Sequence, residues 1–354
     1  MNSVAPRLPF LDALRGYAIL GVIVVHVEQK APLSSSLAEK YAQHGSRGVQ
    51  LFFIVSAVSI AMAWHARGDG YLRFLARRLF RLLPALSLAV VGYVAFGGTH
   101  PKWWHAALTL SFLNGWHPSA IDSAVPGAWT LSAEMMFYLS VPLLASSIRS
   151  LRSAAIWILC AQVIFMTTGR WVWAFWNAVN PEGIGYTNET YFGISPLASA
   201  KWFILGWTTY LVMQRFSLSP KASQALFCLA IVCLVLGPLS PSWTLHELAF
   251  MFGIPAAVYA MSRGAAAMLD NAPMRWLGTI SYSMYLWHFV IHWTLADHLE
   301  RPSFLFLFAC TLALTTLCAS VTYVLIERPG IRLGAALLRG RYARSTPQLD
   351  PNAV

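Results

Sequence analysis

Residues 11–26 read LDALRGYAILGVIVVH, a hydrophobic stretch that contains three ionisable side chains. On an α-helix, Asp12, Arg15 and His26 share one face, because positions 12, 15, 19, 22 and 26 are separated by alternating steps of three and four. Ionisable side chains are costly next to lipid and usually face a protein interior or a cavity. At 1.5 Å per residue, His26 lies roughly 16 Å along the helix axis from Arg15. The stretch therefore predicts a membrane helix with a cation and a proton-transfer group at opposite ends of one polar face.

The composition of the whole chain agrees with a membrane location. Its 354 residues are 57% hydrophobic and 11% charged, whereas about a quarter of the residues of a soluble domain are charged. The five cysteines lie in apolar segments without paired metal-ligand spacing, so we expect neither disulfides nor a metal site. The hydrophobic N-terminal segment carries Asp12 and Arg15 and is followed by no small-residue cleavage site, so we expect no cleavable signal peptide.

Ten segments are long enough, or nearly so, to cross a bilayer. They cover residues 10–28, 48–66, 83–98, 129–147, 154–169, 200–214, 223–238, 244–262, 278–297 and 303–326. With the N-terminus inside, 17 of the 25 lysines and arginines fall on the inner side and 7 on the outer side. Because short cytoplasmic loops are enriched in Lys and Arg, the sequence predicts an all-α bundle of about ten transmembrane helices with both termini in the cytoplasm.

The net charge of +11 follows from this topology. We expect the inner cations to meet anionic membrane lipid or a nucleotide, and we expect no nucleic acid partner, because no nucleic-acid motif accompanies the charge. Residues 1–330 are predicted to form one membrane domain, and residues 331–354 a basic, disordered cytoplasmic tail.

Three further groups of polar residues fall inside or beside predicted spans. Glu134 shares a face with Thr130 and Tyr138, at steps of four. The span begins outside, so Glu134 should lie in the outer half of the membrane, as His26 does. A carboxylate beside a histidine can fix its tautomer and stabilise its charged form. The alternative is a purely structural pair between helices.

The second group is Ser281, Tyr285, His288 and His292, at steps of four, three and four. Their common face predicts a cavity wall, although hydrogen bonding between helices explains any single member equally well.

The third group is the basic stretch 73–84 at the cytoplasmic mouth of the third span. Arg78 and Arg81 lie three residues apart and face the same way, at the same inner level as Arg15. Guanidinium groups pair bidentately with phosphate oxygens, so the stretch predicts an anion clamp. The alternative is a set of interfacial arginines that snorkel to the headgroups.

Together these residues resemble the acyltransferase family 3 membrane proteins, and the matching blocks follow the order of the family along nearly the whole chain. The blocks are Asp12 to Gly16 with His26, Gly48 to Ser56, Arg77 to Pro84, Trp129 to Tyr138, Ser281 to His288, and Glu327 to Pro329. Ala57 departs from the family, which commonly has glycine at this position; the departure concerns the packing of the second span.

The resemblance implies a ten-helix core in the bacterial inner (cytoplasmic) membrane. Such a core takes an acyl group, usually acetyl, from cytoplasmic acyl-CoA and delivers it to a hydroxyl of a carbohydrate on the far side. It implies that His26 is the catalytic histidine and Glu134 its acidic partner. Arg15, Arg78 and Arg81 would bind the phosphates of acetyl-CoA or another acyl-CoA.

We assign Trp129, Ser281, Tyr285 and His288 to a substrate channel. The short C-terminal region leads us to expect no hydrolase-like domain, so that transfer takes place on the membrane domain. The acceptor could instead be a small secreted molecule. The rival from another class is a proton-coupled transporter or flippase with Asp12, Arg15, His26 and Glu134 as its proton relay. The sequence leaves open the acyl length, direct or covalent transfer, and the oligomeric state.

Overall fold

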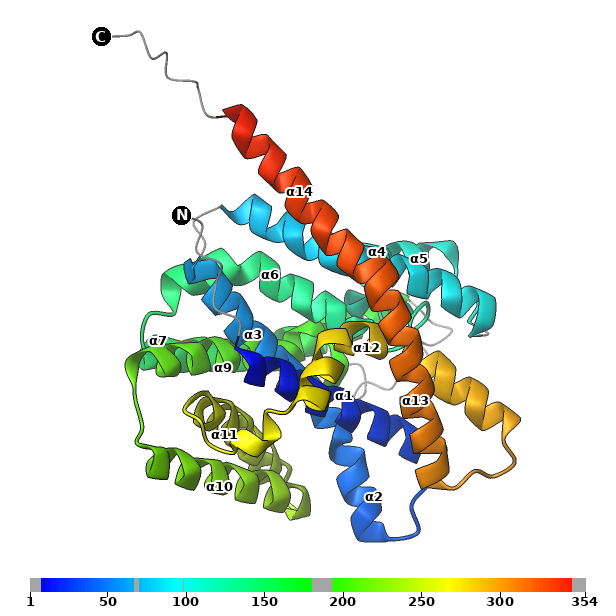
Figure 1. Ribbon diagram of the computed structural model, residues 1–354, viewed down its shortest axis with the longest axis horizontal. Coiled ribbons are helices and arrows are strands. Elements are labelled where there is room, and N and C mark those ends of the chain that lie inside the picture. Colours follow the sequence, from blue (N-terminus) through cyan, green and yellow to red (C-terminus); the bar gives the residue numbers. More distant parts are fainter. Residues whose placement is uncertain (1–7, 67–69, 98, 180–192, 346–354) are drawn as a thin grey trace.

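The computed structural model describes residues 8–66, 70–97, 99–179 and 193–345, and within them the chain is helical and contains no β-strand (Figure 1). A helix covers each of the ten predicted segments. The helices are α1 (Pro9–Glu28), α2 (Ser36–Gln43), α3 (Gly48–Ala66), α4 (Tyr71–Phe96), α5 (Trp103–Leu110), α6 (Trp129–Ser147), α7 (Leu151–Val179), α9 (Pro196–Arg215), α10 (Pro220–Leu236), α11 (Trp243–Ser262), α12 (Ala272–His298), α13 (Phe304–Thr322) and α14 (Arg328–Ser345).

Seven helical stretches among the described residues are long and apolar enough to cross a membrane. They contain α1, α3, α4, α7, α10, α11 and α13. The remaining long helices, α6, α9 and α12, are less apolar, and α6 and α12 carry two of the predicted polar faces. The protein is therefore a multi-pass membrane helical bundle. The count of ten crossings and the cytoplasmic side of both termini stay predictions.

Helix α1 lies in the middle of the bundle and packs most extensively against α12 (Figure 1). Small residues allow this approach. A Cβ added to Gly278 of α12 would overlap the carbonyl oxygen of Asp12, and one added to Gly16 of α1 would overlap that of Met274. In a membrane, helices associate chiefly through such close packing and interhelical hydrogen bonds. The contact brings the polar faces of α1 and α12 into one interior.

Helix α14 occupies part of the region predicted as a basic, disordered tail. Residues 331–345 belong to α14, which packs along α4. Residues 346–354, the rest of the predicted tail, lie outside the described residues. Gly330 and Gly334, one turn apart, let the two backbones approach: an added Cβ would lie 2.7 Å from the Phe80 carbonyl oxygen and 2.6 Å from Phe80 Cβ, respectively. The basic composition concealed this packing face, because arginines on the exposed side of a helix do not prevent the opposite side from docking.

Candidate active site

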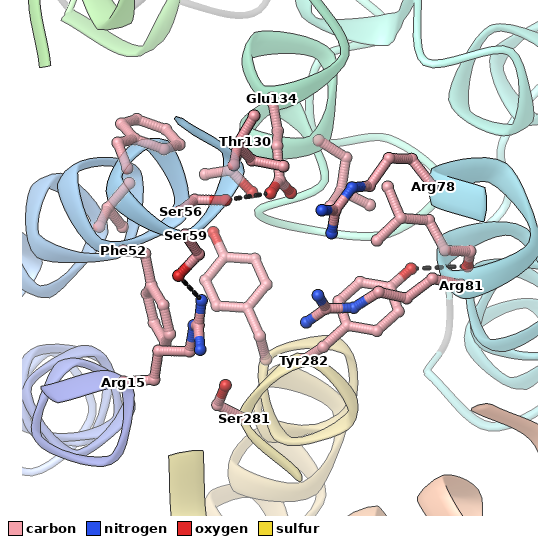
Figure 2. A pocket seen from close by; sticks show the side chains of 16 residues that line it. Arg15, Phe52, Ser56, Ser59, Arg78, Arg81, Thr130, Glu134, Ser281 and Tyr282 are labelled. Carbon is pink, nitrogen blue, oxygen red and sulfur yellow. Dashed lines mark hydrogen bonds between the residues drawn. The ribbon is translucent and has the colours of Figure 1, made fainter. Parts of the chain in front are cut away.

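A cavity lies where α1, α3, α4, α6 and α12 meet (Figure 2). Sixteen residues line it, and six of them are predicted site residues: Arg15, Arg78, Arg81, Glu134, Ser281 and Tyr285. Residues from five helices, far apart in the sequence, thus converge on one space.

Arg15 is held from two sides. Its Nη1 atom donates a hydrogen bond to Asp12 Oδ1 at 2.9 Å, and its Nη2 atom donates to Ser59 Oγ at 2.7 Å. The Ser59 hydroxyl in turn donates to the carbonyl oxygen of Val55 at 2.8 Å. These bonds tie α1 to α3 and fix the direction of the guanidinium group.

Glu134 lies at nearly the same level of the bundle as Arg15. Its Oε1 atom accepts hydrogen bonds from Ser56 Oγ at 2.6 Å and from the hydroxyl of Tyr138. Ser56 is three residues from Ser59 on α3, which is about 4.5 Å along a helix axis. The carboxylate attracts all three arginines of the cavity, so Glu134 is a counter-charge of the arginine group.

Arg78 and Arg81 extend from α4 toward the centre of the cavity (Figure 2). The guanidinium of Arg78 lies 5.4 Å from the ring centroid of Phe74 and 5.6 Å from that of Tyr138. Its Nε atom is buried and has no hydrogen-bond partner among the described side chains. A buried donor without a partner is costly, and a ligand oxygen in the cavity would supply the missing acceptor.

The strongest attraction on Arg81 comes from Glu327. Glu327 is 1% exposed, ends a π-helical turn between α13 and α14, and accepts a hydrogen bond from Ser283 Oγ at 2.9 Å. π-Helical turns often occur at functional sites. The sequence analysis gave Glu327 no role, although the block from Glu327 to Pro329 belongs to the family resemblance. Three arginines are therefore matched by three carboxylates, those of Asp12, Glu134 and Glu327.

His26 lies outside the cavity, near the other end of α1. Its Nδ1 atom is 3.1 Å from Gln29 Oε1. Its ring centroid is 5.3 Å from that of His288, 4.2 Å from that of Phe289 and 6.3 Å from that of His292. Among the described residues, no group of three or more His, Cys, Asp or Glu side chains is placed to hold a metal ion.

The structure does not bring Glu134 and His26 together. Glu134 is bound to Ser56 at the level of Arg15, whereas His26 lies about three helical turns farther along α1. The prediction assigned both residues to the outer half of the membrane, but half of a hydrocarbon core is about 15 Å thick. A shared half therefore does not imply contact.

The predicted channel residues divide into three groups. Ser281 and Tyr285 line the cavity. His288 lies beyond Tyr285, with 5.5 Å between the two ring centroids, and joins the ring cluster around His26. Trp129 does not line the cavity and instead contacts the Phe53 ring edge-on, at 6.4 Å. Tyr285 thus connects the arginine cavity with the histidine cluster.

A loop residue anchors Tyr285 in this position. The Tyr285 hydroxyl donates a hydrogen bond to the carbonyl oxygen of Gly127 at 3.1 Å, and the Gly127 N–H donates to Asp122 Oδ1 at 2.7 Å. Gly127 has a φ of +81°, which other residues rarely adopt. The catalytic, donor-binding and channel roles of all these residues stay predictions.

Comparison with curated proteins identifies relatives whose sequences are only about a quarter identical to this chain but align with nearly all of it. The chain is 24% identical to YrhL of Bacillus subtilis, named as a candidate peptidoglycan O-acetyltransferase, over 91% of its own length and 54% of that protein. It is 27% identical to BcsY of Komagataeibacter xylinus, named as a candidate membrane-bound transacylase, over 91% of its own length and 82% of that protein. It is 23% identical to the O-acetyltransferase OatA of Staphylococcus aureus, over 96% of its own length and 61% of that protein.

The chain thus spans about half the length of the first of these relatives and about three fifths of the third. No solved structure matches it significantly. The family comparison is more extensive, because the acyltransferase domain of acyltransferase family 3 matches residues 8–324. That match includes the arginine cavity, Glu134 and the histidine cluster, and it confirms the resemblance that the sequence blocks indicated: the chain belongs to acyltransferase family 3.

Proposed function

We propose that the protein is a membrane-bound O-acyltransferase of the bacterial inner membrane that moves an acetyl group from cytoplasmic acetyl-CoA to a hydroxyl of an extracytoplasmic carbohydrate. The observation that carries the proposal is the convergence of Arg15, Arg78 and Arg81 on one cavity. His26 lies on the same face of α1 as Arg15 and roughly 16 Å away.

The arginine cavity suits the phosphates of the donor. Guanidinium groups bind phosphate oxygens in a fork geometry, and Arg78 has a buried Nε donor without a partner among the described side chains. The cavity continues to Tyr285, which contacts the ring cluster around His26. An extended phosphopantetheine arm would follow this path and bring the thioester to His26, while the nucleotide stays at the cytoplasmic mouth.

His26 would act as the general base. The O–H bond of the acceptor breaks, its proton moves to His26 Nε2, and the acceptor oxygen forms a bond with the thioester carbonyl carbon. The carbon–sulfur bond then breaks, and the departing thiolate takes the proton from His26. The proton of the acceptor hydroxyl thus ends on the thiol of coenzyme A, His26 returns to its neutral form, and the step needs no further reactant.

The names of the relatives support a carbohydrate as the acceptor. YrhL and OatA are both named as O-acetyltransferases, and the name of YrhL specifies peptidoglycan. A small secreted molecule is the second acceptor class. The transporter alternative explains buried ionisable residues, but it gives no reason for three arginines in one cavity or for the family match.

The test compares the acetyl ester content of surface and exported glycans in cells with the wild-type protein, without it, and with the variant His26→Ala. We expect the ester to be lost in both altered strains. The matched control is His298→Ala, which changes an exposed histidine at the end of α12 that bonds only to its own helix. Unchanged glycans in both strains would exclude a glycan acceptor. If acetyl-CoA consumption were unchanged too, the enzyme assignment would fail.

A further inference from the structure

Catalytic histidines usually need a partner that fixes the tautomer and the direction of the ring. Glu134, the expected partner, belongs to the arginine group, where its carboxylate accepts hydrogen bonds from Ser56 and Tyr138. The position beside His26 is therefore open to another residue.

Gln29 occupies that position. It follows the last residue of α1, and its backbone N–H donates to the carbonyl oxygen of Val25 at 3.2 Å, so it continues the helical turn that carries His26. Its side-chain Oε1 atom lies 3.1 Å from His26 Nδ1. In this orientation of the amide, the oxygen can only accept, so Nδ1 carries the hydrogen. The Nε2 atom of His26 is then left unprotonated and able to take a proton.

The other side chains around His26 do not offer this interaction. His288 Nδ1 donates to the carbonyl oxygen of Tyr285 at 2.7 Å, and its Nε2 atom has no hydrogen-bond partner among the described residues. His292 Nδ1 is engaged by the carbonyl oxygen of His288 at 3.1 Å. Phe289 contributes only an aromatic ring, tilted against that of His26, and a phenyl ring has no polar atom that could orient the imidazole. The two histidines of α12 are thus fixed by their own backbone and pack against His26 without orienting it through a hydrogen bond.

We propose that Gln29 is the positioning residue of His26, and that Glu134 acts on the donor site and not on the base. This inference rests on the proposed function. It gives Gln29 the orienting role that the sequence analysis had assigned to Glu134, and it moves Glu134 to the donor site. Gln29 selects the Nε2 lone pair of His26, and Glu134, together with Asp12 and Glu327, holds three mutually repelling guanidinium groups in one cavity.

The two halves of the proposal predict different kinetic defects. Inverted membrane vesicles expose the cytoplasmic face to added acetyl-CoA, so transfer of label from radioactive acetyl-CoA to vesicle material gives a maximal rate and a KM for the donor. Gln29→Met removes the amide at nearly constant length. We expect its maximal rate to fall by about tenfold or more with an unchanged KM for acetyl-CoA. Gln29→Glu keeps an acceptor oxygen at the same distance and should restore most of the rate.

Glu134→Gln keeps an oxygen for Ser56 and Tyr138 but removes the charge. We expect the KM for acetyl-CoA to rise about tenfold, because one of the three carboxylates that balance the three arginines is then neutral and the arginines are less firmly held. Binding of coenzyme A to the purified protein, followed by calorimetry, should weaken in Glu134→Gln and remain unchanged in Gln29→Met. The effects of the two substitutions should multiply in the double variant, as expected for separate sites.

Gln43→Met is the matched control. Gln43 is an exposed amide on α2 that bonds only to Glu39 on its own helix, and its replacement should alter neither parameter. A wild-type maximal rate in Gln29→Met would overturn the proposal. So would a Glu134→Gln variant with normal donor KM and a strongly reduced rate, because that pattern places Glu134 in the chemical step. Absence of label transfer by wild-type vesicles would instead contradict the proposed function itself.

Discussion

Arg15 and Ser59 form a 2.7 Å hydrogen bond that crosses from α1 to α3. One turn away on the same face of α3, Ser56 donates to Glu134 of α6. Two serines of one helix therefore set the positions of a cation and a carboxylate that belong to two other helices. Helix α3 therefore contributes a wall of the arginine cavity and positions its charged groups, although it supplies none of the charges.

Replacement of Ser59 by alanine tests this arrangement. Arg15 would keep Asp12 but lose its anchor on α3. A hydrogen bond to a charged group contributes about 1.5–3 kcal/mol, so we expect the KM for acetyl-CoA to rise by roughly one order of magnitude. Ser140→Ala is the control, because that hydroxyl bonds only to the backbone of its own helix. An unchanged KM in Ser59→Ala would show that Asp12 alone positions Arg15.

Arg78→Lys keeps the charge and removes the fork of donors, including the Nε atom that lacks a partner. We expect coenzyme A to bind about tenfold more weakly, because an ammonium group cannot form the bidentate contact with phosphate. Arg152→Lys, on the exposed side of α7, serves as the control. Equal affinity in wild type and Arg78→Lys would show that Arg78 acts only as a diffuse charge.

Glu327→Gln removes the strongest attraction on Arg81. A buried cation that loses its partner destabilises a protein by about 3–5 kcal/mol, so the thermal midpoint of the purified protein should fall. The phosphates of coenzyme A would supply new counter-charge. Saturating coenzyme A should therefore raise the midpoint of this variant more than that of the wild type. An equal rise in both proteins would place the bound phosphates away from Arg81.

Gly278→Ala tests the contact between α1 and α12. The added methyl group would overlap the carbonyl oxygen of Asp12, and overpacking of this kind costs about 1–3 kcal/mol. We expect a lower thermal midpoint together with a loss of transfer, because the shift moves Asp12 and hence Arg15. Gly193→Ala is the control, since no atom of the described residues, its chain neighbours aside, lies within 4 Å of the added group. A Gly278→Ala protein of normal stability would mean that the two helices separate at little cost.

Periodicity in the sequence predicted which residues share a face, and the structure brings some of these residues to one cavity where neighbouring helices meet. The face of α12 that carries Ser281 and Tyr285 lines the cavity, as does Arg15 of α1. Periodicity does not give the depth at which residues of two different helices lie relative to each other. That depth depends on close approaches such as the one at Gly278 and on hydrogen bonds such as the one between Ser56 and Glu134.

The same limit explains the residues that were missed. Gln29 and Glu327 lie at helix ends, where no repeating pattern marks a polar face. Glu327 acts on Arg81 across nearly 250 positions of sequence, through a packing contact that composition does not reveal. The docking of α14 was missed for a related reason, because its glycines indicate a close contact only once the partner helix is known.

The π-helical turn at residues 323–327 is not the physical end of this domain. The family match stops at residue 324, inside that turn and three residues before Glu327. A chain trimmed to the matched residues would lose the counter-charge of Arg81, together with the glycine face of α14 that rests on Phe80. The smallest unit with a complete arginine cavity therefore extends beyond the homology boundary, and truncation for expression or crystallisation should retain α14.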